Sequence, residues 1–209
     1  SGKSSVAQMD GSGDRRALML LLLIYSSTAQ EIIINDHPTG DQQPARSTGS
    51  ANWLEGTYAG CSQSHGNSAR NGLDFHHDGA RNKGQVEATY EPNIPRCGCY
   101  DVYEWHPGGR DCANHMPQRV PITVHESCAA GSGLVQPMTV YVNHAMNGAR
   151  WNHIGQFHFD TGVNRIVSSN RGTTDCAYTG ACYWVADAIK LVYNSEACRT
   201  VGYSEPNSG

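Results

Sequence analysis

The sequence predicts an all-β protein, an antiparallel β-sandwich of the jelly-roll kind, stapled by disulfides and carrying an apolar N-terminal extension. Several short segments alternate apolar and polar residues, as strands buried on one face do. Twenty-three Gly and nine Pro, with ten Tyr and four Trp, fit short strands joined by turns, and helical periodicity is almost absent. Eight Cys, without zinc-type spacing, indicate disulfides formed in an oxidising compartment.

Residues 1–30 are predicted to form the extension. Arg15 and Arg16 precede an apolar run, and small residues follow it, which is typical of a secretory signal cleaved after Ala29. The run is too short for a membrane span, which needs ~20 apolar residues. The alternative is an ordered assembly segment that packs against another copy of the chain. Its residues are Ala17, Leu18, Met19, Leu20, Leu21, Leu22, Leu23, Ile24 and Tyr25.

The sandwich itself is predicted over residues 31–195, followed by a polar C-terminal tail over residues 196–209. Alternation and turn residues predict its strands in chain order. They are 31–35, 53–58, 85–90, 99–105, 121–126, 138–143, 164–168 and 183–193. Glu91 and Pro92 are expected to end the third strand, because proline cannot donate a ladder hydrogen bond. Residues 61–82 are read as a long polar loop.

Residues 138–159 are the stretch around which the prediction is organised. A strand is followed by Asn147 and Gly148, which tolerate the backbone of a tight turn, and then by a second alternating segment. Trp151 lies between the two strands. We expect it to plug the end of a sheet, and an exposed platform for a ligand is the alternative.

The cysteines allow many pairings, of which spacing favours few. Cys176 and Cys182 bracket a Gly-containing loop and are expected to pair. Cys97 and Cys99 flank one Gly, should point the same way on a strand, and each need a distant partner, with Cys61 and Cys198 among the candidates. Cys112 and Cys128 flank the strand at 121–126 and are expected to meet.

Four segments resemble the golvesin C-terminal domain family, also described as the xanthan-lyase carbohydrate-binding-like domain. They are NGARWN with IGQFHF at 147–159, CYDVYEWHP at 99–107, PITVHE at 121–126 and YWVADAIKLV at 183–192. They occur in the family's order, and the resemblance covers roughly residues 31–193. It implies an extracellular antiparallel β-sandwich that is often attached to enzymes and is not itself catalytic.

Catalytic and metal motifs are absent from the sequence. Residues 60–64 miss the Gly-x-Ser-x-Gly pattern at the last position, and His125-Glu126 lacks the second His of a zincin. No metal site and no cofactor are therefore predicted. Asp74, Asp78 and Asp101 are expected to be solvated rather than to bind calcium. Asp187, inside a strand, is expected to make structural hydrogen bonds.

The predicted function is recognition or assembly outside the cell, without catalysis. The first hypothesis is a structural subunit of a homopolymeric extracellular fibre, and the alternatives are a secreted carbohydrate-binding module or an accessory domain of a polysaccharide-degrading enzyme. A net charge of −4 with 16% charged residues makes nucleic acid an unsuitable partner. Sugar binding uses exposed aromatic rings with flanking polar groups. The candidates are Trp53, Tyr58, Trp105, Trp151 and Asn152.

Overall fold

The computed structural model describes residues 30–35, 45–49, 54–56, 75–81, 83–127, 137–177 and 181–194. All of its strands lie between Glu31 and Asn194. The extension at 1–30, apart from Gln30, and the tail at 196–209 lie outside these residues, as does the whole candidate assembly segment, so the predicted domain boundaries stay predictions. Within the described part of the chain, no helix is long and apolar enough to cross a membrane.

The first sheet contains β1 (Glu31–Asn35), β13 (Ala188–Asn194), β6 (Gly98–Trp105) and β9 (Asn152–Phe159), in that spatial order. All three pairings are antiparallel. The apolar alternation is the reason these segments become strands: Ile32 and Ile34 of β1 are buried, whereas Ile33 between them is 38% exposed. β1 and β9 are the edges of this sheet.

The second sheet runs in the order β10 (Gly162–Val163), β5 (Glu87–Ile94), β11 (Arg165–Ser169), β7 (Val120–His125) and β8 (Met138–Val142), and β2 (Ala45–Gly49) also pairs with β5. A smaller sheet joins β12 (Val185–Ala186), β4 (Phe75–His77) and β3 (Leu54–Gly56). The short helix α2 (Arg110–Asn114) follows β6.

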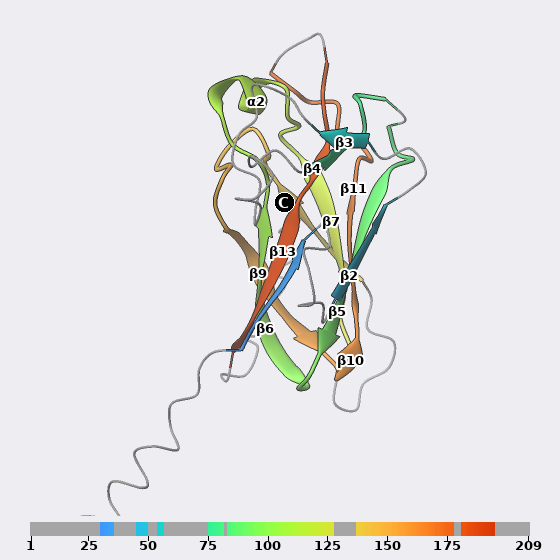
Figure 1. The fold of residues 1–209 in the computed structure, drawn as a ribbon, viewed down its shortest axis with the longest axis vertical. Coiled ribbons are helices and arrows are strands. Elements are labelled where there is room, and N and C mark those ends of the chain that lie inside the picture. The colour runs from blue at the N-terminus through green and yellow to red at the C-terminus, as the bar shows by residue number, and fades with distance from the viewer. Residues whose placement is uncertain are drawn as a thin grey trace, which may run out of the picture. The chain divides into compact units, whose positions relative to one another are not determined.

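The core lies between the two larger sheets, which face each other in Figure 1 with β6, β9 and β13 in one layer and β5, β7 and β11 in the other. Both layers contribute residues that are almost completely buried, among them Tyr100, Phe157, Phe159, Tyr90, Ile122 and Ile166. The fully buried Trp184 joins them and donates its indole N–H to the Ser168 hydroxyl at 3.3 Å. Burial of this apolar surface is the main force holding the sheets together.

The fold class is confirmed: the described chain is nearly all β, its sheets are antiparallel, and a disulfide joins Cys176 to Cys182 as expected. Cys97, Cys99 and Cys112 are also disulfide-bonded, and no described cysteine is free. Cys97 and Cys99 differ from expectation. Cys97 is exposed just before β6, whereas Cys99 is buried within it, because the strand begins only at Gly98.

Three local predictions are wrong. β5 continues through Pro92, which lies where the neighbouring strand changes from β11 to β10, and its carbonyl accepts from the Asn164 N–H at 2.9 Å. The closing strand is broken at Asp187 into β12 and β13, which join different sheets. The region read as a polar loop contains β4, whose Phe75 is only 2% exposed.

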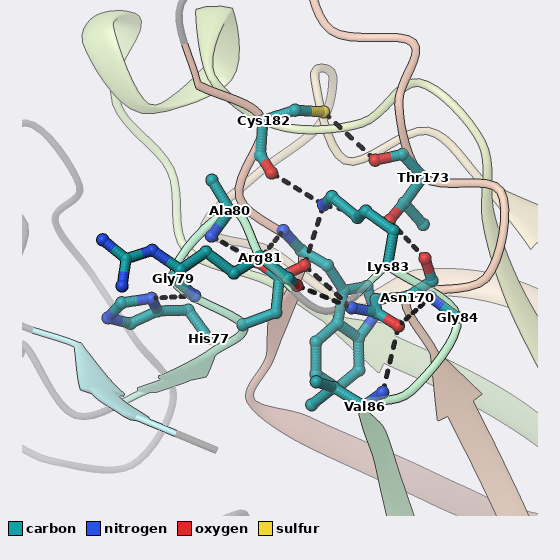
Figure 2. Close-up of polar contacts among 12 residues, drawn as sticks. His77, Gly79, Ala80, Arg81, Lys83, Gly84, Val86, Asn170, Thr173 and Cys182 are labelled. Atoms are coloured by element: carbon teal, nitrogen blue, oxygen red, sulfur yellow. Dashed lines mark hydrogen bonds and ion pairs between the residues drawn. The ribbon is translucent and has the colours of Figure 1, made fainter. Parts of the chain in front are cut away.

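Asp78 is the largest correction among the acids, because it is buried rather than solvated, with 1% of its surface exposed. One carboxylate oxygen accepts from the Lys83 ammonium at 2.8 Å and from the Asn170 amide at 3.0 Å. The other accepts from the backbone N–H groups of Ala80 at 2.9 Å and Trp184 at 3.1 Å. Figure 2 shows how these contacts tie the segment around Lys83 to distant parts of the chain.

Candidate functional site

A hollow of about 480 Å³, here called the arginine groove, lies on the outer face of the second sheet. Strand alternation creates it. Ile122 and Val124 of β7 are buried, so Thr123 and His125 lie on the opposite, outer face and line the groove. Thr139 on β8 faces Thr123 directly, and their hydroxyls are hydrogen-bonded at 2.9 Å. The floor of the groove is therefore polar and is formed by paired strands.

Positive charge dominates the arginine groove. Arg119, Arg165 and Arg171 line it, and Glu87 is the acid among its lining residues. The pKa of His125 is lowered, first by partial burial and then by the charge of Arg165, so this imidazole is neutral near pH 7. Charge of this kind on a concave surface attracts an anionic ligand.

Tyr141 on β8 is the exposed aromatic residue of the groove, with 55% of its surface accessible. The guanidinium carbon of Arg119 lies 3.8 Å from the centre of its ring. At this distance the cation attracts the π-face, which favours this arrangement of the two side chains. An aromatic ring that is exposed yet fixed is suited to stacking on a flat ligand face, because little side-chain entropy remains to be lost on binding.

A second hollow of about 520 Å³, here called the edge groove, lies between β8 and β9, the edge strands of the two facing sheets. Val140, Val142 and Ile154 provide its apolar part. Its polar part comes from the loop between the strands and the residues next to it: Asn143, Asn147, Arg150, Asn152 and His153. Tyr141 lines both hollows, so they adjoin at this residue.

The candidate sugar-binding residues have mixed positions. Trp151 and Asn152 both line the edge groove. Trp105 packs edge-on against Trp151 with ring centres 5.4 Å apart, and both rings are half-buried. The Asn152 amide donates to backbone oxygens of Asn147 at 3.3 Å and Arg150 at 3.1 Å, so it also fixes the loop. Trp53 and Tyr58 lie outside the described residues.

Sequence reasoning missed Tyr141 and the arginines. The alternation of residues 138–143 already placed Tyr141 on the outer face of its strand, and this was the available signal. Arg119, Arg165 and Arg171 carry no such signal. Arg119 lies just before β7, whereas Arg165 and Arg171 belong to β11 and the turn after it, and only the pairing of β11 with β7 brings the two segments to one face.

Sequence reasoning also missed a buried cluster formed by Glu104, His106 and His144, whose donor atoms all lie within 4.8 Å of one another. The Glu104 carboxylate is 3.0 Å from His106 Nδ1 and 3.2 Å from His144 Nε2. No metal was predicted from the sequence, because the three residues are spread over two segments and match no spacing motif. This donor set is one that divalent metals bind.

Within this cluster, burial and the neighbouring charges shift the pKa values of Glu104 and His106 in opposite directions. Burial alone would raise the pKa of Glu104, but the charges of His106 and His144, together with the hydrogen bonds of His106, outweigh burial and hold that pKa well below the usual range. Burial would lower the pKa of His106, and the Glu104 charge reverses the sign and raises it. Burial and the charge of His106 together lower the pKa of His144 despite the nearby carboxylate.

Comparison with known proteins relates the chain to one family. The sequence profile of the golvesin C-terminal domain matches residues 41–193. A xanthan lyase of Bacillus sp. (strain GL1) is 28% identical over 123 residues, which cover 59% of this chain and 12% of that protein. The solved structure of a Paenibacillus xanthan lyase superposes with a TM-score of 0.54 at 27% identity, over 79% of this chain and 13% of the other. The chain thus spans only a small part of the xanthan lyases it matches.

Proposed function

This chain belongs to the golvesin C-terminal domain family, and from that premise we propose that it is a carbohydrate-binding accessory module that acts outside the cell and catalyses no reaction itself. Its similarity to a small part of xanthan lyases supports an accessory role beside polysaccharide-degrading activity. The bonded cysteines support an oxidising, extracytoplasmic location.

One observation carries the proposal: Tyr141 is exposed, is held by Arg119 and lies where the arginine groove meets the edge groove. Sugar rings have an apolar face that stacks on aromatic rings and hydroxyls that bond to polar side chains. Tyr141 offers the first kind of contact, and the asparagines of the edge groove offer the second. A chain of sugars would cross β8 at this ring and contact both hollows.

The charge of the two grooves narrows the ligand to acidic saccharides. Four arginines, including Arg150 of the edge groove, line the hollows, with Glu87 as the acid among them. Guanidinium groups pair with carboxylates through two parallel, charge-assisted hydrogen bonds, and neutral sugars have no negative charge to strengthen such a contact. Sugars that carry carboxylate groups are therefore the ligands we expect.

The fibre hypothesis has less support. It depends on the apolar segment from Ala17 to Tyr25, which lies outside the described residues, and the reported comparisons give no support for self-assembly. The carbohydrate-binding alternative is consistent with both the family and the surface of the sandwich, so it becomes the proposed function.

Affinity electrophoresis in gels containing acidic or neutral polysaccharides tests this proposal. We expect acidic polysaccharide to retard the protein, with the effect weakening as salt rises. Loss of the Arg119 guanidinium in Arg119→Ala, or of the ring in Tyr141→Ala, should reduce affinity roughly 10-fold or more, the effect of about 1.5 kcal/mol.

Arg96→Ala is the matched control, because Arg96 also stacks on a tyrosine, with its guanidinium carbon 4.6 Å from the Tyr193 ring, but lines neither groove. Retardation by no polysaccharide, or equal losses in the Arg96 and Arg119 variants, would overturn the proposal. New chain ends released from polysaccharide by the pure protein would contradict its non-catalytic part.

A further inference from the structure

The cluster of Glu104, His106 and His144 is buried within the protein, with 4%, 0% and 2% of these residues exposed. Glu104 is near the end of β6 and His106 follows that strand directly, whereas His144 belongs to the loop after β8. Two segments almost forty residues apart in the sequence therefore place three metal-binding side chains within reach of one point. Moving charged groups from water into the protein interior costs free energy unless they are paired or bind a metal, so a buried cluster of this kind calls for an explanation.

The hydrogen bonds of His106 require a positive charge between its ring and Glu104. Its Nε2 lies 2.9 Å from the carbonyl oxygen of Met146, which can only accept, so Nε2 carries a proton. Its Nδ1 then faces both carboxylate oxygens of Glu104, at 3.0 and 3.1 Å. A bare lone pair would repel the carboxylate there. Either a second proton or a metal ion must lie between them.

His144 supplies the independent observation. Its ring is buried, yet among the residues that the structure describes neither of its nitrogens has a hydrogen-bond partner. Its Nε2 is 3.2 Å from Glu104 Oε1, close enough to attract but not aligned to donate a hydrogen bond. Buried polar atoms are nearly always satisfied, so a buried imidazole that faces a carboxylate without making a hydrogen bond points to a ligand.

We propose that Glu104, His106 and His144 bind one divalent metal ion of the zinc class. Two imidazole nitrogens and a carboxylate are a ligand set that zinc favours, with bonds of about 2.0–2.2 Å. Ligands at such bond lengths lie roughly 3.3 Å apart in a tetrahedral site. The separations of 3.0 and 3.2 Å from Glu104 Oε1 are close to that value. The two rings are stacked with centres 4.4 Å apart, so binding would tilt them apart.

The surroundings already hold the ligands as metal sites do. The Met146 carbonyl fixes the ring of His106 by accepting from Nε2, and the Asn152 amide donates to Glu104 Oε2 at 3.3 Å. Such outer contacts orient the ligands of a metal. Both come from the segment that shapes the edge groove, and the Ala149 N–H also bonds the His106 carbonyl at 2.8 Å. A bound ion would tie this loop to the end of β6.

Calorimetric titration of the full, chelator-treated chain with zinc chloride tests the site. The unmodified protein should bind one more equivalent than His144→Ala, and an excess of zinc of 100-fold over Kd should raise the Tm by roughly 5–10 °C. His153→Ala is the matched control, since His153 also pairs with an acid, Asp101 at 3.0 Å, but on the surface. It should keep the extra equivalent and the rise in Tm.

A second measurement does not depend on how the variant folds. Cobalt added to the unmodified protein should give the visible absorption of a tetrahedral site, and zinc should remove it. Nitrogen NMR of the His106 ring should show that Nδ1 loses its proton on adding zinc. The proposal is overturned if the unmodified protein binds no zinc, if His144→Ala binds the same number of ions, or if His106 keeps both ring protons in excess zinc.

Discussion

Replacing Asp78 with Asn tests whether the buried carboxylate holds the sandwich together. The substitution preserves shape but leaves one acceptor oxygen where there were two. The carboxylate accepts four hydrogen bonds, two at each oxygen, so two donors must now face the new amide N–H₂ in either orientation. With the oxygen kept toward the backbone, the Lys83 ammonium and the Asn170 amide each lose their hydrogen bond to residue 78.

The expected cost follows from the bonds lost. A hydrogen bond to a charged group contributes about 1.5–3 kcal/mol and a neutral one about 1 kcal/mol, so Asp78→Asn should lower the free energy of unfolding by about 2–4 kcal/mol. Removing one partner of a fully buried ion pair costs ~3–5 kcal/mol. The estimate is lower here because the Lys83 side chain is 24% exposed and keeps its bond to the Cys182 carbonyl at 2.7 Å.

Urea unfolding of the oxidised protein, followed by circular dichroism, measures this difference from the midpoint and slope. Glu31→Gln is the matched control, because it makes the same acid-to-amide change in a surface pair, 3.5 Å from Lys190, with Glu31 46% exposed. That variant should lose under about 1 kcal/mol. If both substitutions lower stability by the same amount, the buried network does not stabilise the fold as argued.

Three further predictions concern the groove and the loops. In Gly148→Ala the new Cβ would lie 2.5 Å from the Pro107 carbonyl oxygen, so thermal unfolding should reveal a loss of about 1–3 kcal/mol. An NMR titration should give His125 a pKa below its ordinary 6.5, and Arg165→Ala should raise it part of the way, since burial is the larger cause. Replacing the Cys176–Cys182 pair with Ala should cost roughly 2 kcal/mol in urea unfolding, because the loop it closes is short.

For each of these three predictions, a specific measurement would contradict the reasoning. If Gly148→Ala leaves the free energy of unfolding unchanged, the loop can shift away from the Pro107 carbonyl without losing stability. Because a depressed pKa means that the folded state resists protonation, His125 stabilises the fold above pH 6.5 and less as the pH falls. A pKa of His125 that is unmoved by Arg165→Ala would contradict the described proximity of the two charges. A disulfide loss much above 2 kcal/mol would show that the loop also supports the Lys83 contact to Cys182.

Alternation predicted most of the fold because strands buried on one face must repeat every second residue. It placed β1, β6, β7 and β8 within a residue of their observed bounds. It failed where partners rather than periodicity decide the structure. Pro92 stays within a strand because its neighbour changes there, and three residues around His76 are too few to show a period.

The candidate site was predictable only in part. Trp151 and Asn152 follow from their place after a turn, and both line the edge groove. Which strands become neighbours depends on long-range pairing, and no local pattern encodes it. The arginine groove requires that order, and the buried cluster requires His144 to reach back to the end of β6. Local residue alternation therefore cannot predict side chains that come together only through long-range strand pairing.

The pairing of β1 with β13 has a consequence for how such a unit is tethered. Glu31 lies opposite Val192, and Val192 lies opposite Asp101 of β6, so the chain enters and leaves the sandwich side by side. Trp105, which contacts Trp151 of the edge groove, is at the other end of β6. A unit with neighbouring entry and exit points can be spliced into a loop of a larger protein without stretching its host. Held there by its base, it would present the edge groove on the side away from the attachment.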